Sequence, residues 1–161
     1  MSQVHLADLS SEKDSKAIVQ LLNVYATDLF GGGQPLVDYT RENLVEELRK
    51  RPTCHVLLAS VDEEPAGLAI CFEAFSTFLC RPILNIHDFA VAPEFRGRGI
   101  SKDLLAKVEE QARRLGCCKI TLEVLEHNEI ARSVYAGFGF RSYELDPKMG
   151  RALFYEKKLM G

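Results

Sequence analysis

Hydrophobic positions early in the chain recur at helical spacing. The first set follows intervals of one, three and four residues and consists of Ala17, Ile18, Leu21, Leu22 and Tyr25. It predicts an amphipathic helix that starts at Ser11. Thr40 can cap a second helix, which the pair Arg51-Pro52 would end. Between the two helices, LFGGGQP holds three glycines and a proline and is expected to be a loop.

The rest of the chain alternates apolar runs of strand length with two further helical patterns. Strands are predicted at residues 3–6, 55–61, 67–77, 83–91, 119–125, 140–145 and 152–159. Helices are predicted at residues 104–115 and 128–138. Hairpins come first and strand–helix–strand crossovers follow. The order therefore predicts one α+β domain over residues 1–161, with three layers and a mixed, mostly antiparallel sheet flanked by helices.

Composition excludes several classes of function. Hydrophobic residues make up 47% of the chain and charged residues 27%, and the net charge is −3, so nucleic acid is not an expected partner. No apolar run is long enough to cross a membrane, and the first residues lack the layout of a signal peptide. The five cysteines show neither metal-ligand nor disulfide spacing. We therefore expect no metal, no membrane contact and a cytoplasmic location.

The stretch VAPEFRGRGIS, residues 91–101, carries candidate chemistry. It joins a predicted strand to a predicted helix, where free backbone amides and the helix dipole can bind a phosphate-like anion. Gly97 and Gly99 permit positive φ angles and close approach of the anion, while Arg96 and Arg98 add positive charge. The stretch matches neither a Walker loop nor a Rossmann fingerprint. Taken alone, it could equally be a flexible turn with solvated arginines.

The pattern Arg96-x-x-Gly99-x-Ser101 resembles the pyrophosphate-binding motif of the GNAT superfamily of acyl-CoA N-acyltransferases. Farther along, NEIARSVYAGFGF, residues 128–140, resembles the second signature of the same superfamily. Ser101 stands where glycine or alanine is usual, but the side chain remains small. Within the superfamily, residues 75–82 look most like the diamine (spermidine/spermine) acetyltransferase branch. That branch has a glutamate where this chain has His87.

The resemblance implies a GNAT-like fold whose sheet is splayed between its fourth and fifth strands. It also implies an acetyl-CoA-dependent N-acetyltransferase that works without a metal. The expected acceptor is a primary amine of a small molecule, such as a polyamine, a diamine or a lysine-like amino acid, and the expected assembly is a homodimer. The residues that the resemblance implies for binding acetyl-CoA are Phe89, Ala90, Val91, Arg96, Gly97, Arg98, Gly99, Ile100, Ser101, Asn128 and Tyr135.

Acetyl transfer by direct attack needs a neutral amine, a polarised thioester carbonyl and a proton for the departing thiolate. By its motif position, Tyr135 is expected to be the general acid, although it could be a core aromatic residue. His87 is the candidate base because an ordinary histidine has a pKa of about 6.5. Whether His87, a water chain or no protein base takes the amine proton stays open.

Candidate acceptor-binding residues are Asp88 and Glu123, which could hold an ammonium, and Phe30, which lies in the predicted glycine-rich loop. His87 and Asp88 would face opposite sides of a regular strand, unless a bulge intervenes. Two alternative functions remain: a peptide or protein N-acetyltransferase, and a non-catalytic CoA-binding sensor. Tyr135 and the intact first motif argue against the sensor.

Overall fold

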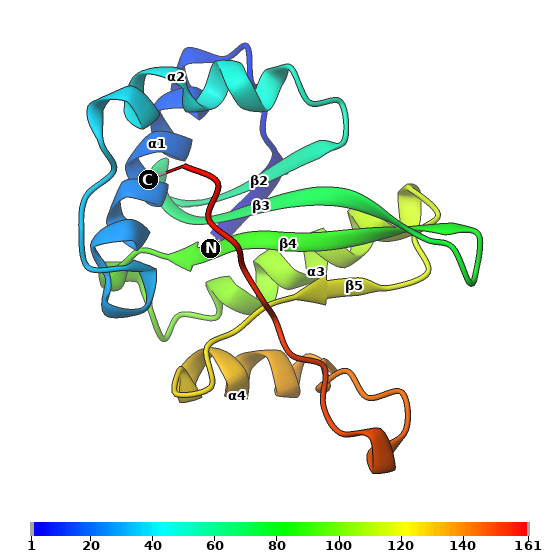
Figure 1. Ribbon diagram of the computed structural model, residues 1–161. Helices are drawn as coiled ribbons and strands as arrows, with labels where there is room; N and C mark the ends of the chain where they lie inside the picture. The colour runs from blue at the N-terminus through cyan, green and yellow to red at the C-terminus, as the bar shows by residue number, and fades with distance from the viewer. Residues whose placement is uncertain (1, 161) are drawn as a thin grey trace.

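A five-stranded sheet runs through the computed structural model, which describes residues 2–160 (Figure 1). Its strands are β1 (Ser2–Leu6), β2 (Cys54–Val61), β3 (Glu64–Ser76), β4 (Arg81–Val91) and β5 (Ile120–Leu122), and they lie side by side in that order. β1 to β4 pair antiparallel, whereas β5 runs parallel to β4. The predicted mixed, mostly antiparallel sheet is confirmed.

Helices cover both faces of this sheet (Figure 1). The helices are α1 (Glu12–Thr27), α2 (Asp38–Arg49), α3 (Ile100–Arg114) and α4 (Glu129–Gly137). α1 and α2 pack on one face and α3 and α4 on the other, and each pair closes its own apolar core. Leu57 and Leu58, neighbours in β2, belong to opposite cores, as strand alternation requires. The layered α+β arrangement is therefore as predicted.

The two helices of the first layer differ in how they begin. The helix predicted to start at Ser11 is present as α1, and Ser11 caps it, because its side chain accepts a hydrogen bond from the amide of Asp14. The prediction that Thr40 caps α2 is wrong. α2 already begins at Asp38, after Val37, which forms no side-chain cap.

A β-bulge changes which face of the sheet the end of β4 presents. Ile86 pairs with Cys71 and Asp88 pairs with Ile70, so His87 is the extra residue. Ile86 and Cys71 belong to the core beneath α3, whereas Ile70 belongs to the core beneath α1. Asp88 therefore faces the α1 side. The bulge that the sequence analysis left open is present.

β4 and β5 diverge after a short paired stretch. Pairing joins Leu84 to Ile86 of β4 with Ile120 to Leu122 of β5, and β4 then continues unpaired on this side to Val91. The predicted splay between the fourth and fifth strands is confirmed. Within residues 2–160, the backbone groups of β4 after Ile86 therefore have no strand partner on this side.

The strands predicted at residues 140–145 and 152–159 are wrong. Neither segment forms a strand, and after α4 the described chain is irregular except for the 3-10 turn η3 (Pro147–Met149). Large apolar residues in this segment, such as Leu153 and Tyr155, are exposed. A strand requires a paired edge as well as an alternating pattern, and among residues 2–160 nothing pairs with this segment.

Candidate functional site

A cavity of about 910 Å³ opens where β4 and β5 diverge. Its walls come from the end of β4, the turn before α3, the chain after β5, and parts of α1 and α4. The predicted site residues that line it are Phe30, Phe89, Ala90, Val91, Arg96, Gly97, Gly99, Ser101, Glu123, Asn128 and Tyr135. The structure thus brings together residues that lie more than a hundred positions apart in the chain.

Other predicted site residues lie outside this lining. The side chain of Ile100 is buried in the core beneath α3. The guanidinium of Arg98 lies over the ring of Phe95, 5.4 Å from its centroid, rather than in the cavity. Only the backbone amides of Ile100 and Arg98 are therefore candidates for ligand contacts.

His87, the residue predicted as the base, is not among the residues that line the cavity. Its side chain is exposed and packs edge-on against Phe72, with 5.6 Å between ring centroids. Asp88 is half-buried and also lies outside the lining. Burial raises the pKa of Asp88, and the neighbouring His87 offsets part of that rise. The charge of Asp88 nevertheless acts on Tyr25, which lines the cavity.

The turn before α3 presents free backbone amides to the cavity. Gly97 and Gly99 have φ angles of 76° and 83°, a left-handed conformation that glycine tolerates best. The amide of Arg96 donates to the carbonyl of Pro93 at 3.2 Å, so it is not free. Among residues 2–160, no group accepts a hydrogen bond from the amides of Gly97, Arg98, Gly99, Ile100 and Ser101. Free amides at the start of a helix form a binding site for anions.

α4 places Tyr135 in the cavity wall. Asn128 caps this helix, because its side-chain oxygen accepts a hydrogen bond from the backbone amide of Ala131 at 3.2 Å. The ring of Tyr135 lies edge-on to Phe89 and Phe140, at centroid distances of 5.8 and 5.9 Å. Burial, with a smaller effect of Tyr25, raises the pKa of Tyr135 to about 12. The hydrogen bonds formed by residues 2–160 do not involve its hydroxyl, which is therefore available to a ligand.

The sequence analysis missed Tyr25 and Asp28 as cavity residues. Tyr25 lines the cavity, and burial followed by the charges of Asp88 and Asp28 raises the pKa of its phenol. Its spacing identified it only as part of the apolar face of a helix. Asp28 lines the cavity too, and its carboxylate lies 2.7 Å from the guanidinium of Arg96. No pattern in the sequence indicates a contact between segments so far apart.

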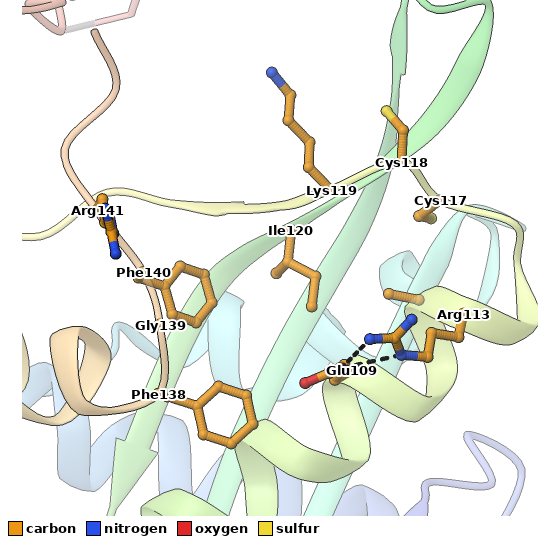
Figure 2. A pocket seen from close by; sticks show the side chains of 11 residues that line it. Glu109, Arg113, Cys117, Cys118, Lys119, Ile120, Phe138, Gly139, Phe140 and Arg141 are labelled. Carbon is orange, nitrogen blue, oxygen red and sulfur yellow. Dashed lines mark hydrogen bonds and ion pairs between the residues drawn. The ribbon is translucent and has the colours of Figure 1, made fainter.

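A second cavity, of about 350 Å³, lies between β5, α3 and the chain after α4. Figure 2 shows the rings of Phe138 and Phe140 turned toward Ile120, and Arg113 paired with Glu109. Burial is the main cause that raises the pKa of the Cys117 thiol in this wall, so the reactive thiolate is disfavoured. Among residues 2–160, no cluster of histidine, cysteine and carboxylate side chains could hold a metal ion. The larger cavity is therefore the candidate site.

Residues 17–140 match the model of the acetyltransferase (GNAT) family. The chain belongs to this GNAT family. The resemblance carried by its two motifs is thereby confirmed. A thialysine N-epsilon-acetyltransferase of Caenorhabditis elegans is 33% identical over 96 residues, which are 58% of this chain and 59% of that protein. An aminoglycoside N(6')-acetyltransferase type 1 of Salmonella typhimurium is 30% identical over 77 residues, 48% of this chain and 49% of that protein.

These matches span about half the length of the curated relatives. Solved structures with the same fold cover the GNAT chain more completely. A possible acetyltransferase from Clostridium difficile has a TM-score of 0.79 at 17% identity, covering 100% of this chain and 99% of its own. The structure of AAC(6')-Iy in complex with the bisubstrate analogue CoA-S-monomethyl-acetylneamine has a TM-score of 0.75 at 21% identity and covers 98% of this chain and 99% of its own. At these identities the likeness shows the fold.

In this GNAT member, one cavity thus combines a candidate anion site made of backbone amides with the phenol of Tyr135. The exposed Glu123 adds a carboxylate to its rim. Within residues 2–160, no helix is long and apolar enough to cross a membrane. The arrangement can hold a diphosphate at one end and supply a proton to a leaving group deeper in the wall.

Proposed function

We propose that the protein is an acetyl-CoA-dependent N-acetyltransferase that acts on a primary amine of a small molecule. The observation that carries the proposal is the shared cavity between β4 and β5, lined both by the free amides before α3 and by the hydroxyl-bearing Tyr135. Family membership supports the reaction class. Relatives named for thialysine and aminoglycosides support a small-molecule amine as the acceptor.

The residues present fit acetyl-CoA. The amides from Gly97 to Ser101 have no acceptor among the described residues and would hold the diphosphate. The unpaired edge of β4, from Phe89 to Val91, would pair with the amide groups of the pantetheine arm, as a sheet edge pairs with an added strand. The backbone amide of Phe89 is the candidate donor to the thioester oxygen. Acetyl-CoA supplies the activated acetyl group.

Tyr135 would act as the general acid. In the reaction the neutral amine nitrogen would bond to the acetyl carbon and lose one of its protons to water, while the carbon–sulfur bond would break and the departing sulfur would take the phenolic proton. A pKa of about 12 keeps Tyr135 protonated at neutral pH, so the proton is always in place. The hydroxyl then regains a proton from solvent.

Solvent would remove the proton from the amine. His87 lies outside the cavity lining, whereas the cavity rim at Glu123 is exposed to water. The Glu123 carboxylate would attract the ammonium form of the acceptor to this rim. Phe30 would contact the alkyl part of the acceptor on the opposite wall.

An assay of CoA thiol release from acetyl-CoA tests the function. The panel contains lysine, thialysine, putrescine, spermine, an aminoglycoside and a peptide with a free N-terminus. We expect turnover with at least one small amine. This turnover should be faster than turnover with the peptide. Preference for the peptide would favour a peptide N-acetyltransferase, and tight acetyl-CoA binding without turnover would favour a CoA-binding sensor.

We further propose a cytoplasmic homodimer. The five cysteines are free thiols, which supports a reducing compartment. The segment after α4 exposes several large apolar side chains outside the cavity lining: Leu145, Leu153, Tyr155, Leu159 and Met160. Apolar patches of this kind are typical of association surfaces. Light scattering on the purified protein would report a mass near twice that of the 18.1 kDa chain, and a monomeric mass would reject the dimer.

A further inference from the structure

An ion pair joins the chain after α1 to the turn before α3. The guanidinium of Arg96 donates through Nη2 to Asp28 Oδ2 at 2.7 Å and through Nε to the carbonyl of Val91 at 3.1 Å. All three residues line the larger cavity. The Arg96 side chain therefore links both the end of β4 and the chain after α1 to the turn that carries the free amides.

Asp28 in turn organises residues 28–33, which we name the acceptor loop. Its carboxylate accepts a hydrogen bond from the amide of Phe30 at 3.4 Å. Its carbonyl accepts from the amides of Gly31 and Gly33 at 3.0 and 3.1 Å. Gly32 and Gly33 have φ angles of 112° and 73°, and glycines leave the loop free to change shape. The place of Phe30 in the cavity wall therefore depends on Asp28.

The charges of the pair support a stable contact. The hydrogen bond from Arg96 is the main cause that lowers the pKa of Asp28 below its usual range. The Asp28 side chain is 25% exposed, so water competes with Arg96 only in part. Arg98, by contrast, lies over Phe95. The two arginines of the turn thus have different partners.

We propose that the side chain of Arg96 is a positioning residue for the acceptor loop, while the backbone amides of the turn hold the diphosphate. The proposal rests on the proposed function, because it assigns the diphosphate and the acceptor to two ends of one cavity. Arg96 then couples the two ends: the turn that holds acetyl-CoA also fixes the wall that contains Phe30. The resemblance to the GNAT motif had implied for Arg96 only a role in binding acetyl-CoA.

Three variants separate this role from direct contact with the diphosphate. Asp28→Asn removes the charge but keeps a side-chain oxygen that can accept from the Phe30 amide. Arg96→Met removes the guanidinium and keeps an unbranched side chain. Arg98→Met is the matched comparison, because it shows how much acetyl-CoA affinity is lost when the turn loses one positive charge. The double variant of Asp28 and Arg96 completes a mutant cycle.

The expected result is a change on the acceptor side. Asp28→Asn and Arg96→Met should each raise the KM for the best amine about fivefold or more. The double variant should be no worse than either single variant, because both remove the same contact. Calorimetry should show that Arg96→Met weakens acetyl-CoA binding no more than Arg98→Met does.

Two results would overturn the proposal. One is a loss of acetyl-CoA affinity in Arg96→Met well beyond that in Arg98→Met, with no effect of Asp28→Asn. The other is additive effects in the double variant. Hydrogen exchange in residues 28–33 gives a readout independent of activity: both single variants should exchange faster than the wild type. If the wild type acetylates no amine, the proposed function is rejected. Independently of that result, hydrogen exchange of residues 28–33 that is as slow in both single variants as in the wild type would reject the positioning role of Arg96.

Discussion

Replacing Gly99 with alanine tests the backbone-amide site without changing any charge. Gly99 has φ 83° and ψ 0°, and a β-carbon there would meet no heavy atom within 4 Å. The cost to the folded protein therefore comes from backbone conformation and not from a clash. Gly116 follows α3, has φ 71° and is equally open, but it does not line the larger cavity. Gly116→Ala is thus a matched control.

Both variants should lose stability by similar amounts. An alanine in the left-handed region costs roughly 1–2 kcal/mol, so the free energy of unfolding should fall by about that much in each. Only Gly99→Ala adds a methyl group in open space beside the free amides. We expect its acetyl-CoA affinity to fall at least tenfold, about 1.4 kcal/mol, because the methyl group displaces the diphosphate or the turn relaxes away from it.

Urea unfolding measures the first effect and titration calorimetry with acetyl-CoA measures the second. Gly116→Ala should bind acetyl-CoA as the wild type does. If the two variants are destabilised equally and also bind acetyl-CoA equally well, the amides before α3 are not the diphosphate site. That result would reject the central step of the proposed function.

The remaining predictions concern Tyr135 and His87. Tyr135→Phe should lower turnover by roughly 100-fold in steady-state assays and leave acetyl-CoA binding intact, because it removes only the acid; full activity would return Tyr135 to a packing role. His87→Ala should give a pH–rate profile that overlays the wild type from pH 6 to 9, and loss of its acidic limb would restore His87 as the base. Burial raises the pKa of Tyr135 to about 12, so the folded protein keeps a proton that the unfolded chain releases near its ordinary pKa of about 10. The stability that this proton linkage contributes is fully present below pH ~10 and is lost as the pH rises toward 12. The melting temperature of Tyr135→Phe should therefore fall less over this pH range than that of the wild type.

Local patterns in the sequence predicted the elements that local interactions specify. α1 begins where Ser11 caps it, and α4 begins after Asn128, because a capping side chain and an apolar face lie within a few residues of each other. The glycine turn before α3 could also be predicted, since positive φ angles favour Gly97 and Gly99. The two motifs also contribute residues to the cavity wall, among them Arg96, Gly99 and Tyr135.

Features that depend on distant partners could not be predicted. Residues 152–159 include a short apolar run that is typical of a strand, but the run does not say whether a strand edge lies beside it. Tyr25 has the spacing of a core residue, and only the fold turns it toward the cavity. The contact of Arg96 with Asp28 spans 68 positions, and neither residue type indicates it.

The bulge at His87 shifts the alternation of side chains along β4 by one residue. Before it, Ile86 builds core beneath α3; after it, Phe89 returns to that side and meets Tyr135, while Asp88 is turned away. If β4 kept residue 87 but paired with β3 without a bulge, the alternation that follows would be inverted, with Asp88 facing the phenol of Tyr135 and Phe89 facing α1. Deleting residue 87 would instead remove the bulge and leave Asp88 and Phe89 on the sides that they occupy now. A variant that lacks residue 87 should therefore keep Phe89 against Tyr135, whereas a variant that keeps the residue and loses the bulge should not.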